Sequence, residues 1–469
     1  MAVTGPIWRI EEDIGIGAKR SGALTWPRGF STHTGMIFIR IALGAGILFA
    51  SAGITTAQPS MAVQTIFQDS VPHTDRQGKA RVVFNKERSF FSIGIYHGLT
   101  GEHHGRTFDF STLRAGGFNT VMAWEGQRLA DVAKAAKKNG LQVIHRYPSD
   151  AEILKWRSSG TILAWYLNEE PTWLVREDNW RGRLAQFKAR RKEIQKLDPG
   201  RAVFILDAPY IDAPWRARWS AWNSSGDISA HWNYPIIGER RYSLGGSRGI
   251  PETVSLAARI NEEAKPVWLV VQAFSSPLKN WRMPSATELR AMVYAGIVHG
   301  ATGILYFAYD SFVTRYGEVI GVSPETVENY NAVPGSNTED LLWLQASEEQ
   351  VTKSRALWDF ISKLNAELTA LTPAILSPTS RMAYRVETKL SGTPIRTIMK
   401  ETEGGKILIA VNIRNAQLET QIHFGQPVRL RPLSFGDLER KFTNVKSINE
   451  TFEPFEVKLF QLEDRSYRR

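Results

Sequence analysis

The chain has 469 residues, too many for one ordinary domain and enough for a barrel with a smaller companion domain. Hydrophobic residues make up 43% and charged residues 22%, which is typical of globular rather than disordered chains. Cysteine is absent, and this excludes disulfides, thiol catalysis and cysteine-ligated metals. The formal net charge of +11 is spread along the chain; its one basic cluster, residues 188–196, is typical of a solvated helix face and argues against nucleic-acid binding.

Residues 36–57 have the pattern of an export signal, with Arg40 before an apolar run and with Thr55 and Ala57 at the positions that a signal peptidase reads. Residues 1–35 are polar, Gly-rich and poorly periodic. We therefore predict that residues 1–57 are an upstream extension and signal peptide, with the true start at Met36, followed by a leader segment over 58–87. A membrane anchor is the alternative, although the apolar run is short against the roughly 20 residues of a spanning helix. Either way the body of the protein is exported, to the periplasm or outside the cell, and signal removal leaves no stable membrane insertion.

Eight short apolar runs follow, alternating with amphipathic segments. The runs are residues 90–98, 118–124, 141–147, 162–170, 202–209, 228–236, 267–274 and 303–310. Between them, segments such as 126–140 and 285–300 have helical periodicity. Eight strands, each followed by a helix, predict an α/β fold, a (β/α)8 TIM barrel over residues 88–371. The competitor is an open doubly wound sheet, but the expected Gly-rich phosphate loop does not follow the first strand.

The pattern changes after the eighth run. Residues 341–371 predict one long helix, and from about residue 380 alternating segments are separated by Gly, Asn and Pro turns. These segments predict a small all-β sandwich domain over residues 372–469. Because no aromatic platform is visible among them, we expect this domain to be structural rather than sugar-binding.

The fourth apolar run ends abruptly in Asn168, Glu169, Glu170 and Pro171. A buried, unpaired carboxylate is costly, so a polar strand end before a turn is the simple explanation. In a (β/α)8 barrel, however, the active site lies at the C-terminal ends of the strands. The sequence therefore predicts that this pair of carboxylates stands at the mouth of the barrel.

Side chains alternate along a strand, so the two glutamates are expected on opposite faces. Glu170 shares a face with Asn168 and Tyr166, whereas Glu169 shares one with Trp165. We expect the polar face to look into the mouth, which favours Glu170 as the reactive residue. A bulge at the strand end would change this assignment.

Several segments resemble the (β/α)8 glycoside hydrolases of the large clan that includes β-galactosidases and cellulases. They are the Glu-Pro pair at 170–171 and residues 198–209, 265–274, 288–309 and 452–463, so the resemblance spans residues 88–463. It points to a poorly characterised subgroup with a C-terminal β-domain. In that clan the general acid/base is a Glu at the end of the fourth strand, inside an Asn-Glu-Pro or Asp-Glu-Pro sequence. The resemblance implies this role for Glu170, with Glu169 at the preceding polar position.

The chain departs from the clan at the seventh strand, where Gln272 stands in place of the nucleophilic Glu. A neutral amide cannot form the glycosyl ester. Either the nucleophile comes from elsewhere, the mechanism is inverting, or the barrel binds sugar without cutting it. Retaining enzymes hold two carboxyls about 5 Å apart and inverting ones about 6.5–9.5 Å. Glu169 is the carboxylate next to Glu170 in the sequence. The other candidates for the second carboxylate are Asp207 and Asp310, and Asp227 and Glu125 are weaker candidates.

Further polar and aromatic residues near the strand ends can hydrogen-bond hydroxyls or stack on sugar faces. The expected substrate-binding residues are Asn168, Gln272, His97, His231, Tyr234, Tyr306 and Arg146, the last as a contact for a substrate carboxylate. His97, His103 and His104 lack a firm metal-ligand spacing, so neither a metal nor another cofactor is expected.

Together these patterns predict an exported glycoside hydrolase that acts on an oligo- or polysaccharide. The alternative is a non-catalytic sugar-binding or polysaccharide-assembly protein on a degenerate barrel, and polysaccharide lyases form a third class. Removing residues 1–57 takes away five basic and three acidic residues and leaves a net charge of +9. A basic surface attracts anionic ligands, which favours an acidic polysaccharide, although the same charge also serves solubility alone.

Overall fold

The computed structural model describes residues 62–65, 90–103, 106–123, 126–174, 179–213, 215–238, 243–261, 265–314, 317–323, 347–433 and 441–463. The expected export signal and the weaker carboxylate candidate Glu125 lie outside the described residues.

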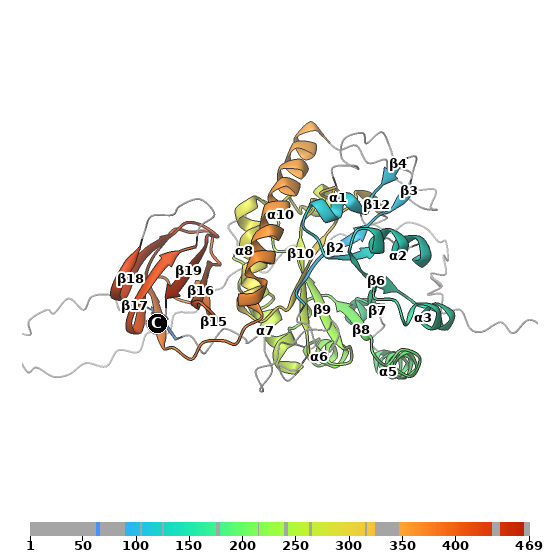
Figure 1. Cartoon of the computed structure of the whole chain (residues 1–469), viewed down its shortest axis with the longest axis horizontal. Coiled ribbons are helices and arrows are strands. Elements are labelled where there is room, and N and C mark those ends of the chain that lie inside the picture. The colour runs from blue at the N-terminus through green and yellow to red at the C-terminus, as the bar shows by residue number, and fades with distance from the viewer. Residues whose placement is uncertain are drawn as a thin grey trace, which may run out of the picture. The chain divides into compact units, whose positions relative to one another are not determined.

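Eight parallel strands form a closed barrel, which confirms the predicted fold (Figure 1). They are β2 (Ser92–Gly98), β5 (Thr120–Ala123), β6 (Gln142–Arg146), β7 (Ile162–Glu169), β8 (Ala202–Asp207), β9 (Ile228–Asn233), β10 (Val267–Gln272) and β11 (Gly303–Phe307). Each barrel strand pairs in parallel with the next barrel strand along the chain, and the pairing of β11 with β2 closes the ring. Because all eight strands run the same way, their C-terminal ends meet at one mouth.

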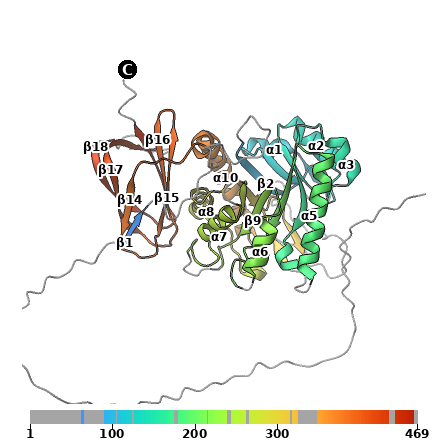
Figure 2. The same ribbon diagram turned by 90° about the horizontal axis from the view of Figure 1, so that it is seen from below.

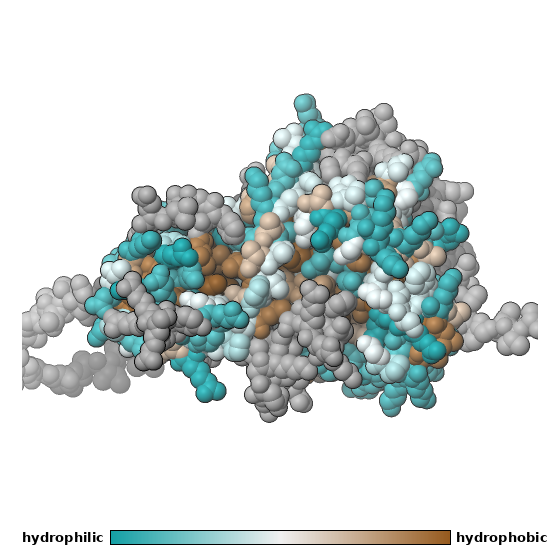
Figure 3. Space-filling model, viewed as in Figure 1, coloured by the Kyte–Doolittle hydropathy of each residue, from teal (hydrophilic) through white to brown (hydrophobic). Residues whose placement is uncertain are grey.

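Helices lie outside the strands, as Figures 1 and 2 show for α2, α3, α5 and α6. Their bounds are α1 (Phe110–Ala115), α2 (Leu129–Lys138), α3 (Asp150–Trp156), α4 (Pro171–Leu174), α5 (Trp180–Leu197), α6 (Arg216–Asn223), α7 (Ile250–Ile260) and α8 (Ala286–Val298), with a 3-10 turn over Pro277–Lys279. The predicted capping box begins α8: the Ser285 side chain accepts from the Glu288 N–H, and Glu288 reaches back to the Ser285 N–H. On the face shown in Figure 3, hydrophilic and intermediate colours predominate over α2 and α5.

Alternation along the strands divides the barrel into two apolar cores. Large side chains such as Tyr166, Phe204 and Trp268 fill the interior. Their neighbours, such as Trp165 and Ile205, face outward and pack against the helices. The direction in which a side chain points therefore follows from its place in this period of two.

Two short antiparallel hairpins follow barrel strands. They are β3 (Gly101–His103) with β4 (Arg106–Phe108), and β12 (Phe312–Thr314) with β13 (Gly317–Val319). The predicted long helix is α10 (Glu348–Ile375). It packs against the outer face of the barrel, where its Asn365 accepts a 2.9 Å hydrogen bond from the Tyr306 hydroxyl.

The C-terminal region is an antiparallel sheet of β14 (Tyr384–Thr388), β15 (Ile395–Thr402), β16 (Gly405–Asn412), β17 (Leu418–Pro432), β18 (Phe442–Phe452) and β19 (Val457–Glu463). β17 pairs with β14 through its first half and with β19 through its second half. The sheet thus folds over its own apolar core, consistent with the predicted sandwich. One further strand, β1 (Ala62–Thr65), comes from the segment predicted as a leader and pairs with β14 (Figure 2).

The two domains share apolar packing. Along β16, Leu408 and Ala410 belong to the core of the sheet, whereas Ile407 and Ile409 belong to the outer core of the barrel. Arg290 of α8 adds a polar link, since it donates a 2.7 Å hydrogen bond to the Val457 carbonyl of β19. The β-domain therefore covers α8, on the outside of the barrel rather than at its mouth.

Candidate functional site

Both glutamates at the end of β7 turn toward the barrel mouth, contrary to simple alternation. The pairing of β7 with β8 shifts register between Tyr166 and Asn168, which places an extra residue at the strand end. Glu170 then adopts a left-handed backbone with φ of 44°, and its N–H donates to the Leu206 carbonyl at 2.8 Å. This bulge and turn bring Glu169 to the same side as Glu170.

Glu169 contacts a tyrosine hydroxyl and an arginine. Its carboxylate accepts a 2.6 Å hydrogen bond from the Tyr96 hydroxyl and forms an ion pair with Arg146. The guanidinium also lies 5.4 Å from the ring centroid of Tyr166 and 5.2 Å from that of Tyr147. The Arg146 side chain is 10% exposed and already paired, which removes the basis for expecting it to bind a substrate carboxylate.

Glu170 has a different environment a few atoms away. Trp232, which faces inward from β9, donates from its indole nitrogen to the Glu170 carboxylate at 2.6 Å. Burial, followed by the charge of Glu169, raises the pKa of Glu170 to about 6, against the opposing effects of the Trp232 hydrogen bond and the Lys279 charge. Two neighbouring carboxyl groups therefore have distinct characters, one ion-paired and one readily protonated.

Asp207 does not face the mouth, which corrects its expected placement as a second catalytic carboxylate. It follows Leu206 on β8 and so points outward, fully buried. Its carboxylate accepts hydrogen bonds from the hydroxyl and the N–H of Thr172, the latter at 3.2 Å. It also accepts a hydrogen bond from the N–H of the next residue, Ala208, at 2.9 Å. Asp207 thereby holds the first turn of α4, directly after Glu170, and acts on the site through that turn.

Burial raises the pKa of Asp207 to about 7, against its hydrogen bonds from Thr172 and Ala208. The native state therefore binds a proton more tightly than the unfolded chain, whose Asp titrates near 3.9. Between about pH 4 and 7 the free energy of unfolding should fall as pH rises, by on the order of 1 kcal/mol per unit from this residue. The free energy of unfolding is measured by urea unfolding at several pH values. Asp207→Asn should lose this part of its dependence on pH, whereas Asp131→Asn, at an exposed position, should keep it. Equal slopes in all three proteins would contradict the assignment.

Gln272 holds backbone rather than facing substrate, which corrects its expected substrate-binding role. Its Oε1 accepts from the Ile236 N–H at 3.0 Å, and its Nε2 donates to the carbonyls of Ile236 at 3.2 Å and Arg282 at 2.9 Å. The side chain is fully buried. Gln272 therefore ties together the segments that follow β9 and β10.

Two other expected contacts lie on the outer face of the barrel. His231 is fully buried, with its Nε2 3.0 Å from the Thr253 hydroxyl of α7, and burial lowers its pKa to about 3. Tyr306 donates to Asn365 of α10. Alternation explains both, since each is next to an inward-facing residue, Trp232 or Phe307. Neither side chain can reach a ligand in the mouth.

The remaining expected residues lie at or near the strand ends. Asn168 is half-buried at the bulge of β7. Asp310 is buried just past β11, its carbonyl close to Gly321. The rings of His97 and Tyr234 both pack against Phe307, at 5.3 and 5.6 Å between centroids. Asn168, His97 and Tyr234 therefore remain candidates for sugar contacts.

Sequence reasoning did not single out Tyr96 as a partner of Glu169. A signal was present, because Tyr96 lies in phase with Gly94 and Ser92 along β2 and so faces inward. Trp232 of β9 faces inward in the same way. It stacks on Tyr234 with ring centroids 4.7 Å apart, which forms an aromatic wall on the Glu170 side of the mouth.

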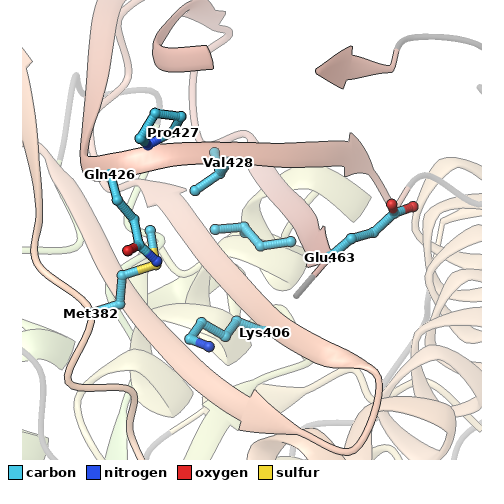
Figure 4. Close-up of a pocket in the computed structure, with 7 residues that line it drawn as sticks. Met382, Lys406, Gln426, Pro427, Val428 and Glu463 are labelled. Atoms are coloured by element: carbon cyan, nitrogen blue, oxygen red, sulfur yellow. The ribbon is translucent and has the colours of Figure 1, made fainter. Parts of the chain in front are cut away.

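A separate pocket of about 200 Å³ lies in the C-terminal sheet (Figure 4). Lys406, Gln426 and Glu463 supply its polar lining, beside Met382 and Val428. Lys406 already pairs with Glu401 at 3.2 Å. No pair of neighbouring carboxylates lines this pocket, so we place the chemistry at the barrel mouth instead.

Among the described residues, no group of three or more His, Cys, Asp and Glu side chains could hold a metal ion. Within the same part of the chain, no helix is both long enough and apolar enough to cross a membrane.

Comparison with known proteins gives structural neighbours only, since no family model and no curated protein matches the chain. AmyP in complex with maltotriose is 12% identical, with a TM-score of 0.48 over 79% of this chain and 97% of AmyP. An Anoxybacillus α-amylase is 15% identical, with a TM-score of 0.46 over 76% and 89%. The α-L-arabinofuranosidase from Thermotoga maritima is 10% identical, with a TM-score of 0.45 over 86% and 100%. Likeness at this level carries no argument about activity, which has to come from the site itself.

Proposed function

We propose that the protein is an exported glycoside hydrolase, with Glu170 as the general acid/base. The observation that carries the proposal is the pair Glu169–Glu170 at the barrel mouth. The carboxylate of Glu169 is paired with Arg146, whereas Glu170 has a pKa raised to about 6. Neighbouring carboxyls whose environments differ in this way suit a division between an acid and an ionised partner.

Hydrolysis would begin when Glu170 gives its proton to the glycosidic oxygen. The bond from that oxygen to the anomeric carbon breaks, its electron pair goes to the departing hydroxyl, and positive charge develops on the anomeric carbon and ring oxygen. The Glu169 carboxylate stabilises this charge. Water then attacks the anomeric carbon and passes its proton to the Glu170 carboxylate, which restores the acid.

The proposal is tested on a panel of oligosaccharides with acidic and neutral members, at low and high salt. Release of reducing ends supports hydrolysis, and an unsaturated product absorbing in the ultraviolet would identify a lyase instead. Binding without release would favour the non-catalytic alternative, which Gln272 at the nucleophile position makes worth testing. The net charge of +9 after removal of residues 1–57 leads us to propose an acidic exported polysaccharide as substrate, so faster turnover of acidic glycans at low salt is expected.

The pH dependence of hydrolysis should follow the protonation of Glu170. Because the acid must be protonated to act, kcat/KM should fall as pH rises through about 6, the raised pKa of Glu170. A glutamate with its ordinary pKa would give the same fall more than one unit lower. The profile is measured from pH 4 to 9 at constant ionic strength. A rate that stays constant from pH 5 to 8 would contradict the role of Glu170.

A further inference from the structure

Tyr147 presents an exposed aromatic ring beside the carboxylate pair. It directly follows β6, and 46% of the residue is exposed, as much as for any large hydrophobic residue in the described part of the chain. Its N–H donates to the Tyr166 carbonyl at 2.8 Å, which fixes its backbone to β7. A large ring that is open to solvent, on a backbone tied to the neighbouring strand, is a suitable surface for stacking.

The backbone of Tyr147 has a left-handed conformation, with φ of 47°. Such backbone is uncommon for a bulky residue, and it concentrates at functional sites. Here two other residues with positive φ, His97 near the end of β2 and Glu170 directly after β7, lie at the C-terminal ends of barrel strands. Tyr147 therefore shares its left-handed backbone with residues at the ends of two other barrel strands, β2 and β7.

Contacts link the ring to the reacting groups. The Arg146 guanidinium lies 5.2 Å from the Tyr147 centroid and pairs with Glu169. The rings of Tyr147 and Tyr166 are nearly parallel, with an angle of 15° and centroids 6.4 Å apart. Tyr166 in turn belongs to the interior core of the barrel. Tyr147 thus lies on the Glu169 side of the mouth, while Trp232 and Tyr234 lie on the Glu170 side.

We propose that Tyr147 is a stacking platform for a pyranose ring, which it holds on the Glu169 side of the cleaved bond. The ligand class is an oligosaccharide of at least two sugars that lies across the mouth from Tyr147 to Trp232. This inference rests on the proposed function for its placement of the cleaved bond. Stacking of a sugar on Tyr147 does not require catalysis, so a measurement of sugar binding tests the platform independently of the proposed hydrolysis.

The test measures binding and hydrolysis in parallel with the full chain. Malto-, cello-, xylo- and oligouronate ladders of one to six sugars are titrated calorimetrically into Glu170→Gln, with and without Tyr147→Ala. The hydrolysis of the same ladders is measured for the single Tyr147 variants in the wild-type background. Leu154→Ala is the matched control, because Leu154 of α3 is also 46% exposed and has no aromatic ring.

For a ladder that binds, Tyr147→Ala should weaken binding of the longer members by about ten-fold, equivalent to about 1.4 kcal/mol, and leave single sugars nearly unaffected. Tyr147→Phe and Tyr147→Trp should retain binding, since each keeps an aromatic face. Hydrolysis with unchanged length dependence in Tyr147→Ala would overturn the platform and leave the proposed function intact. Length-dependent binding that requires Tyr147, without hydrolysis by the wild type, would support the platform and overturn the proposed function. Failure to bind any ladder would overturn the platform.

Discussion

Glu170→Gln should lower the rate of glycoside hydrolysis by about 10²–10⁴-fold, the usual contribution of a general acid. Glutamine preserves the shape and can still accept the hydrogen bond from Trp232, but it cannot give a proton to the leaving oxygen. The loss should be largest for substrates with a poor leaving group and much smaller for an activated aryl glycoside, whose departure needs little protonation. Initial rates on both substrate types measure this difference.

The matched control is Glu403→Gln in the exposed turn between β15 and β16, which should keep the wild-type rate. Circular dichroism and the melting temperature confirm that Glu170→Gln is folded. If the folded variant hydrolysed a natural oligosaccharide at the wild-type rate, the assignment of Glu170 would be wrong.

A second large effect is expected for Glu169→Gln. The neutral amide cannot stabilise positive charge at the anomeric carbon, so hydrolysis should fall by at least about 10²-fold, as in other sites that lose a preorganised electrostatic group. The substitution also removes the second cause of the raised pKa of Glu170. Any residual activity should therefore fall at a lower pH than in the wild type, and the pH profile of the variant measures this shift.

Structural damage is separated from chemistry by combining Glu169→Gln with Arg146→Met. Glu169→Gln alone removes the carboxylate that pairs with the Arg146 cation, whose side chain is 10% exposed, and should cost on the order of 3 kcal/mol of stability. The double variant removes both charges and should recover much of that stability without recovering activity. Recovery of both would make Glu169 a structural ion-pair partner only.

The barrel was predictable because the pattern of an apolar run followed by an amphipathic segment occurs eight times. An error at the end of one strand does not change the number of strands. Side-chain direction was predictable only where the period of two was applied. Applied to β9, it would have selected Trp232 over His231 as the inward-facing residue. It also distinguishes Asp207, which faces outward, from Leu206, which faces inward.

The position of Glu169 could not be deduced from alternation, because the register shift before Asn168 and the left-handed backbone at Glu170 each change the side-chain direction at the strand end. That shift depends on how β7 pairs with β8, which lies some 40 residues further along the chain. The hydrogen bonds of Gln272 to Ile236 and Arg282 are similarly non-local. The residue types at the site were visible in the sequence, whereas their partners depend on tertiary pairing.

The pairing of β1 with β14 has a consequence for the order in which the chain assembles. Ala62 lies opposite Thr388, so the whole barrel must be made between the synthesis of one strand and that of its partner. Contacts of such long sequence separation form slowly, because the entropy of closing the intervening loop has to be overcome first. Until then the edge of β14 is open to pairing with any other extended segment. We therefore expect this sheet edge to be completed late in folding, and until then it is one site at which a newly made molecule is exposed to aggregation.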